Sequence, residues 1–166
     1  MATTATKPVK SDGLFGVPDS VKEIRQRVLE FIEQRIYPVE PEFDELDRTE
    51  VLTRLKELGA EAKREGLWAL GHPKEIGGQG LPFLDYVYVN EVVGRSEYAM
   101  VALGTHSLQD SIMLHLYAND AWRDRYLRPL VDGDVYPSFA MTEPDTASSD
   151  PTQLKTHAEL DGDHWV

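Results

Sequence analysis

Residues 139–150 read FAMTEPDTASSD, and this stretch decides the fold because the character of the sequence changes around it. The residues at 136–141 have the composition of a strand, which would deliver the hydroxyl of Thr142 to a turn at the following proline. Beyond the turn, Ser148 and Ser149 offer small side chains and free backbone amides, which suit an anionic or carbonyl-rich ligand. A surface loop after a strand fits the same residues, so the stretch alone leaves both interpretations open.

Upstream of this stretch, apolar residues recur at the spacing of amphipathic helices. The pattern predicts one helix over 20–36, with Asp19 or Ser20 as its cap. It predicts a second helix over 49–65, with Gly66 as the terminating residue. Both patterns are typical of helices that pack one face against a core.

Three more helices are expected before the strand. Residues 83–93 have a helical apolar pattern, although 86–89 alone has the composition of a strand. Residues 100–116 are apolar on more than one side, so we expect a mostly buried helix at the centre of the domain. A short last helix begins after Asn119 or Asp120 and ends near Gly133.

The chain divides into three predicted parts. Residues 1–17 are expected to be a disordered tail, 18–134 a helical domain, and 135–166 the beginning of a β domain. Residues 154–166 predict a hairpin whose second strand stops after three residues, so we expect the chain to be incomplete as a folding unit. The predicted fold class is therefore mainly α, with a few strands at the C-terminal end.

Composition excludes several kinds of function. The formal net charge of -12 argues against binding to nucleic acid or to an anionic membrane, because phosphates select clustered Lys and Arg. The absence of cysteine excludes disulfides, thiolate zinc sites and iron–sulfur clusters, and it fits a reducing, cytoplasmic location. No apolar run is long enough to span a bilayer.

Other candidate sites have plainer explanations. His106 and His115 do not fall on one helical face, so a metal site is not predicted. The carboxylates at 40–45 lie in a polar, proline-broken stretch and are expected to be surface charge. The glycines at 77, 78 and 80 resemble a phosphate-binding loop, but no strand precedes them, and a tight turn is the better interpretation.

Three further motifs, together with the stretch at 139–150, give the sequence a family resemblance. The stretch at 139–150 resembles the flavin-binding signature of acyl-CoA dehydrogenases, in which a strand ends in Thr-Glu-Pro and a small-residue loop closes in Ser-Asp. PKEIGGQGL at 73–81, RYLRPL at 125–130 and QLKT at 153–156 are similar to segments that the same family carries in the same order. The loop at 145–149 is one residue longer than the commonest form, and it resembles the branch of very-long-chain dehydrogenases often fused to a kinase-like domain.

This resemblance implies a fold and a reaction. Members of the family have a helical N-terminal domain, a β-barrel-like middle domain and a C-terminal helical bundle, and they bind FAD. They convert acyl-CoA to trans-2-enoyl-CoA, with a glutamate as base and hydride transfer to the flavin. The resemblance also implies an electron-accepting protein such as electron-transfer flavoprotein, and a homodimer or homotetramer for the intact protein. The general base is expected beyond Val166, so no catalytic residue is assigned in this chain.

The resemblance also assigns candidate site residues. Phe139, Met141 and Thr142 match the strand beside the flavin ring, and Ser148 and Ser149 match the loop that approaches FAD. On the substrate side, Ser149 is expected near the CoA portion, and Leu108 and Ile112 are expected near the acyl-chain cavity. A related flavoenzyme, such as an acyl-CoA oxidase or a flavin monooxygenase, is the first alternative. A helical interaction module without enzymatic activity is the second.

Overall fold

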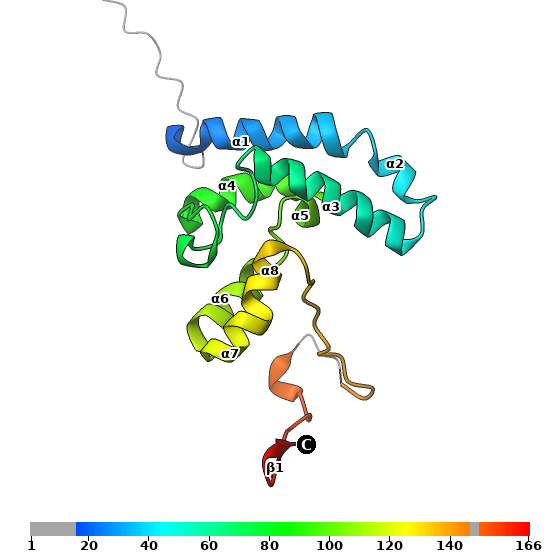
Figure 1. Cartoon of the computed structure of the whole chain (residues 1–166), viewed down its shortest axis with the longest axis vertical. Coiled ribbons are helices and arrows are strands. Elements are labelled where there is room, and N and C mark those ends of the chain that lie inside the picture. Colours follow the sequence, from blue (N-terminus) through cyan, green and yellow to red (C-terminus); the bar gives the residue numbers. More distant parts are fainter. Residues whose placement is uncertain (1–15, 147–149) are drawn as a thin grey trace, which may run out of the picture.

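The computed structural model describes residues 16–146 and 150–166, and it is mainly helical, as the sequence predicts. Most of the predicted tail, together with Ser148 and Ser149, lies outside the described residues. The elements are α1 (Asp19–Phe31), η1 (Ile32–Ile36), α2 (Glu40–Phe43), α3 (Arg48–Arg64), η2 (Lys74–Ile76), α4 (Phe83–Val93), α5 (Ala99–Ala102), α6 (Leu108–Tyr117), α7 (Asp120–Trp122), η3 (Arg123–Leu127), α8 (Arg128–Asp132), η4 (Pro151–Gln153), β1 (Leu160–Asp161) and β2 (His164–Trp165). Figure 1 shows two helical groups, α1–α5 and α6–α8, from which the C-terminal residues extend.

The first predicted helix forms as α1 and continues through the π-helical turn η1 to Ile36. Pro38 follows closely, where a proline cannot continue the helical hydrogen-bond pattern. The start differs from the prediction, because Pro18 occupies the N-cap position and no side chain caps the helix. Asp19 instead lies in the first turn, where its carboxylate is 2.7 Å from the ammonium group of Lys22.

The second predicted helix forms as α3, with side chains capping its N-terminal end and a glycine closing its C-terminal end. The Asp47 carboxylate accepts the backbone amide of Glu50 at 2.9 Å, and the Glu50 carboxylate accepts the amide of Asp47 at 2.9 Å. At the other end Gly66 adopts φ +68°, as the sequence predicts for a terminating glycine. This conformation lets the Leu67 amide donate to the Ala62 carbonyl at 2.8 Å and closes the last turn.

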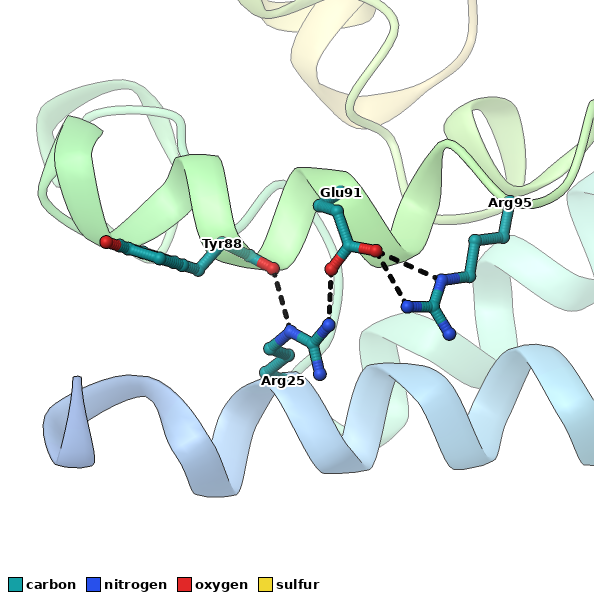
Figure 2. Close-up of polar contacts among 4 residues, drawn as sticks. All are labelled: Arg25, Tyr88, Glu91 and Arg95. Carbon is teal, nitrogen blue, oxygen red and sulfur yellow. Dashed lines mark hydrogen bonds and ion pairs between the residues drawn. The ribbon is translucent and has the colours of Figure 1, made fainter. Parts of the chain in front are cut away.

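A charged cluster on the surface fastens α1 to α4 (Figure 2). The Arg25 guanidinium donates to the Tyr88 carbonyl through Nε at 3.1 Å and pairs with Glu91 through Nη2. The other oxygen of Glu91 accepts Nη2 of Arg95 at 2.7 Å. The hydrogen bonds from Arg95 and Arg25 lower the pKa of Glu91 below its usual value, so the cluster holds an ionised carboxylate between two guanidiniums.

The core of the first helical group also uses a helix that the sequence analysis missed. The carboxylate-rich stretch at 40–45 contains α2, and Phe43 on this helix is buried. Its ring meets Tyr98 edge to face, with 4.5 Å between ring centroids. One side of this stretch therefore belongs to the core, and the predicted surface charge occupies the other.

The predicted long helix at 100–116 is wrong in two respects. The structure divides it into α5 and α6, because Gly104 adopts φ +67° and turns the chain between them. The second half is also not the buried centre of the domain, since only Ser111 is buried within α6. Apolar composition predicted burial here, but no described element covers the outer face of α6.

Trp68 connects the two helical groups. Its indole nitrogen donates to the Val131 carbonyl in α8 at 2.8 Å. Its ring lies against three glycines, where an added Cβ would come within 3.0 Å at Gly59, 2.5 Å at Gly104 and 2.8 Å at Gly133. The ring therefore occupies a slot that exists only because α3, the α5–α6 turn and the end of α8 each provide a residue without a side chain.

The predicted hairpin at the C-terminal end forms around its turn, but the predicted first strand is much shorter, since 154–159 are not in a strand. Strands β1 and β2 pair antiparallel, with Leu160 opposite Trp165 and Asp161 opposite His164. Gly162 in the turn adopts φ +61°, as a tight hairpin turn requires. All four paired residues are exposed, so the hairpin buries no face against the helical groups.

Candidate functional site

Three of the residues predicted to contact a cofactor lie on an exposed segment that leaves the end of α8. Phe139 exposes 71% of its surface and Met141 exposes 43%, and Thr142 is also exposed. The predicted strand at 136–141 does not form, since β1–β2 is the only sheet among the described residues. A strand needs a partner for its backbone groups, and no described segment pairs with this one.

The upstream end of this segment is anchored to the second helical group. The amides of Asp134 and Val135 both donate to the Pro129 carbonyl, at 2.8 and 3.4 Å. The ring of Tyr136 packs against His106, with 5.2 Å between ring centroids. Burial raises the pKa of Tyr136 above its usual value. The segment therefore has a fixed origin, and Phe139, Met141 and Thr142 lie beyond it.

The downstream end is held by the carboxylate of Glu143. Its Oε1 accepts the backbone amides of Lys155 at 3.1 Å and Thr156 at 2.7 Å, and it also accepts the hydroxyl of Thr156. Its Oε2 accepts the Lys155 amide at 3.0 Å. The hydroxyl of Thr156 and the two amides lower the pKa of Glu143 to about 2. Sequence reasoning missed this role, because the partners are backbone amides distant in the chain.

A second carboxylate shapes the other side of the same loop. Asp150 accepts the amide of Thr152 at 3.0 Å, its hydroxyl at 2.6 Å and the Gln153 side-chain amide at 2.9 Å. These hydrogen bonds, the Thr152 hydroxyl first, lower the pKa of Asp150. Asp150 therefore caps the short helix η4. Ser148 and Ser149, which the sequence places before it, lie outside the described residues.

The predicted acyl-side residues lie on α6, apart from the exposed segment. Leu108 is partly buried against the core of the first group, whereas Ile112, one turn later, is 36% exposed. Exposed apolar side chains continue along the helix at Met113, Leu116 and Tyr117. Figure 1 shows α6 on the opposite side of α8 from the segment at 136–143, so the two predicted groups are not brought together.

A buried histidine that sequence reasoning did not single out holds the loop at 71–80. His72 is fully buried, and its Nε2 lies 3.1 Å from the Ser107 hydroxyl. Burial, and then the nearby His106, lower the pKa of His72 to about 4, so the ring is neutral at pH 7. No partner for His72 Nδ1 is found among the described residues. The fully enclosed ring is a structural group of the core rather than a reactive one.

Three kinds of site that the sequence did not favour, a phosphate-binding loop, a metal site and a membrane span, can be compared with the described residues. The amides of Gly78 and Gly80 donate to the carbonyls of Pro73 and His72 at 3.0 and 2.9 Å, so they serve a tight turn and are not free to bind phosphate. Within the described ranges, no cluster of three or more His, Asp or Glu side chains has the arrangement of a metal site. No helix in the same ranges is long and apolar enough to cross a membrane.

Comparison with known protein families identifies the family of the helical part of the chain, α1–α8. Residues 18–134 match the family model described as "Acyl-CoA dehydrogenase, N-terminal domain". The chain belongs to the acyl-CoA dehydrogenase family. The match covers both helical groups and ends where the exposed segment begins.

Individual acyl-CoA dehydrogenases support this assignment. The chain is 34% identical to acyl-CoA dehydrogenase family member 11 of Gallus gallus, over 94% of this chain and 21% of that protein. It is 30% identical to mitochondrial isovaleryl-CoA dehydrogenase of Pongo abelii, over 93% of this chain and 36% of that protein. A solved structure of a protein assigned as an acyl-CoA dehydrogenase from Mycobacterium abscessus matches with a TM-score of 0.79 and 32% identity, over 91% of this chain and 41% of that one. The chain thus spans well under half of these acyl-CoA dehydrogenases.

Proposed function

We propose that this chain is part of a flavoenzyme that dehydrogenates acyl-CoA thioesters to trans-2-enoyl-CoA. The family supports an oxidoreductase of this kind. The observation that carries the proposal is the exposed segment with Phe139, Met141 and Thr142, which presents two large apolar side chains and one hydroxyl to solvent. When bound, FAD would supply the hydride acceptor, which the side chains of the chain do not provide.

The exposed segment suits one wall of a flavin site. Phe139 and Met141 offer apolar area for a planar ring, and the Thr142 hydroxyl offers a hydrogen bond at its polar edge. A donor at that edge would stabilise negative charge that develops on reduction. In this proposal the three residues bind and orient the ring, and Ser148 and Ser149 approach the rest of the cofactor, with Ser149 also near the CoA portion of the substrate.

The carboxylates beside this wall are not suited to act as the general base. Glu143 has a pKa lowered to about 2 by the groups that donate to it. A base with so low a pKa is almost fully ionised but accepts a proton weakly. The same reasoning applies to Asp150, whose pKa is lowered by Thr152 and Gln153. The proposal therefore assigns neither carboxylate as the base, which the family resemblance places beyond Val166.

The apolar face of α6 is proposed as part of the acyl-chain cavity. Leu108 is anchored in the core while Ile112 is exposed one turn later, so the helix presents apolar area that a fatty acyl tail would cover. Each methylene removed from water contributes about 0.8 kcal/mol.

We extend the proposal to electron-transfer flavoprotein as electron acceptor and to a homodimer or homotetramer as the assembled form.

The test is anaerobic reduction of the full-length protein that carries this chain. Flavin absorbance after gel filtration measures cofactor content, and stopped-flow bleaching with straight-chain and branched acyl-CoAs measures the reaction. Thr142→Val should slow bleaching, while Ser138→Ala, at an exposed position of the same segment, should not. A protein without flavin, or a flavin that no acyl-CoA reduces, would contradict the proposal. Rapid reoxidation by oxygen with peroxide release would instead favour an acyl-CoA oxidase.

A further inference from the structure

Glu143 immediately follows Thr142 and connects this position to a distant part of the chain. Its two carboxylate oxygens accept two backbone amides and one hydroxyl from residues 12 and 13 positions further on. These contacts are not local hydrogen bonds between near neighbours in the chain. They join residue 143 to residues 155 and 156. A carboxylate that accepts several donors is a strong hydrogen-bonding centre.

Among the described residues, few other contacts hold the position of Thr142. The backbone of residues 137–142 makes no hydrogen bond to another described residue, and the side chains of Phe139 and Met141 are 71% and 43% exposed. The last fixed point upstream is Tyr136 against His106. Thr142 therefore lies between one anchor six residues before it and the Glu143 contacts directly after it.

We propose that Glu143 is a positioning residue, which places the backbone and hydroxyl of Thr142 for contact with the flavin by fixing the turn to Lys155 and Thr156. The inference rests on the proposed function, since it concerns the same flavin wall. Its chemistry requires a carboxylate, because a glutamine has only one acceptor oxygen and would present N–H groups to the amide of Lys155. Asp145 provides a matched control, as an exposed carboxylate in the same turn.

The experiment compares Glu143→Gln with Asp145→Asn in the full-length, flavin-loaded protein. We expect Glu143→Gln to slow flavin reduction by acyl-CoA about tenfold and to shift the flavin absorption bands, with KM for acyl-CoA changed less than about twofold. Asp145→Asn should leave all three unchanged. Amide hydrogen exchange at Lys155 and Thr156 should accelerate in Glu143→Gln only. Thr156→Val removes one donor to Glu143 and keeps the carboxylate, and it should slow flavin reduction by about threefold. This variant replaces Glu143→Gln as the test if Glu143→Gln does not fold.

The outcomes separate this inference from the proposed function. A wild-type protein that binds flavin and is reduced, with variants that behave like it, would overturn the positioning role and leave the proposed function intact. Faster amide exchange without a change in reduction rate or spectrum would show a merely structural contact and would also overturn the role. A wild-type protein that holds no flavin would overturn both.

Discussion

At the scale of single residues, two titratable groups have strongly shifted pKa values for different reasons. Hydrogen bonds to Glu143 favour its charged form, whereas burial of His72 disfavours its charged form. Neither environment is visible in the sequence. The partners of Glu143 are two backbone amides and the Thr156 hydroxyl, 12 and 13 positions away, and the burial of His72 depends on packing between segments distant in sequence. Thr142 was identified because it lies in a motif, and motifs depend on residue order alone.

The first prediction concerns His72 and the pH dependence of stability. Its pKa is lowered to about 4 in the folded chain, so the unfolded chain binds more protons between pH 6.5 and 4. Stability should therefore fall as the pH decreases through this range, by at most about 3 kcal/mol from this group. Urea unfolding at pH 7.5 and pH 4.5 measures the difference, which should be smaller in His72→Gln. An equal pH dependence in the variant would show that the ring is not buried as a neutral group.

At the scale of elements, a helix was predictable where apolar residues recur along one of its faces. A helix was hard to predict where it is short or where packing against other elements determines its ends and burial. The segments at 20–36 and 49–65 have apolar residues at helical spacing, and both form helices close to the predicted bounds. The segment at 100–116 has the same apolar character, but Gly104 breaks it and α6 is largely exposed. Composition reports that a surface is apolar, and it does not report which element covers it.

The second prediction tests the glycine that divides α5 from α6. Gly104→Ala should destabilise the chain by about 3 kcal/mol, because alanine is strained at φ +67° and its Cβ would come within 2.5 Å of the Trp68 ring. Gly66→Ala is the matched control, since Gly66 has φ +68° but nothing lies within 4 Å of an added Cβ. It should cost only about 1–2 kcal/mol. Urea unfolding measures both, and equal losses would mean that the Trp68 slot tolerates a methyl group.

The third prediction tests the proposed acyl side of α6. Ile112→Trp in the full-length protein should shift the preference toward shorter acyl-CoAs, because the larger ring would occupy space for methylenes worth about 0.8 kcal/mol each. Ile112 is already partly exposed, so the substitution does not disturb the core. Met113→Trp, at the neighbouring exposed position, is the control and should not change the preference. The ratio of kcat/KM across a series of chain lengths is the measurement, and identical series for the variant and the wild type would remove Ile112 from the cavity.

At the scale of the whole molecule, the sequence predicted the mainly helical class and missed the arrangement. The arrangement depends on Trp68, whose indole bonds to Val131 and whose ring lies in the slot of three glycines. Gly59, Gly104 and Gly133 are distant in sequence; Gly59 lies within α3, and Gly104 and Gly133 each fit an ordinary turn or helix end. The three glycines form one slot for the Trp68 ring only when the two helical groups pack together. Apolar periodicity along the sequence therefore could not predict the slot.

The last prediction concerns the chain of residues 1–166 by itself, which should not retain FAD through gel filtration. The proposed flavin wall is one extended segment whose large side chains, Phe139 and Met141, face solvent. Binding costs roughly 4–15 kcal/mol in lost translational and rotational freedom. Contacts on one side of a ring do not offset this cost. Absorbance at flavin wavelengths after gel filtration measures retention, with the flavin-loaded full-length protein as the positive control. Stoichiometric flavin on residues 1–166 would mean that the described residues enclose the ring on more than one side, contrary to the exposure of Phe139.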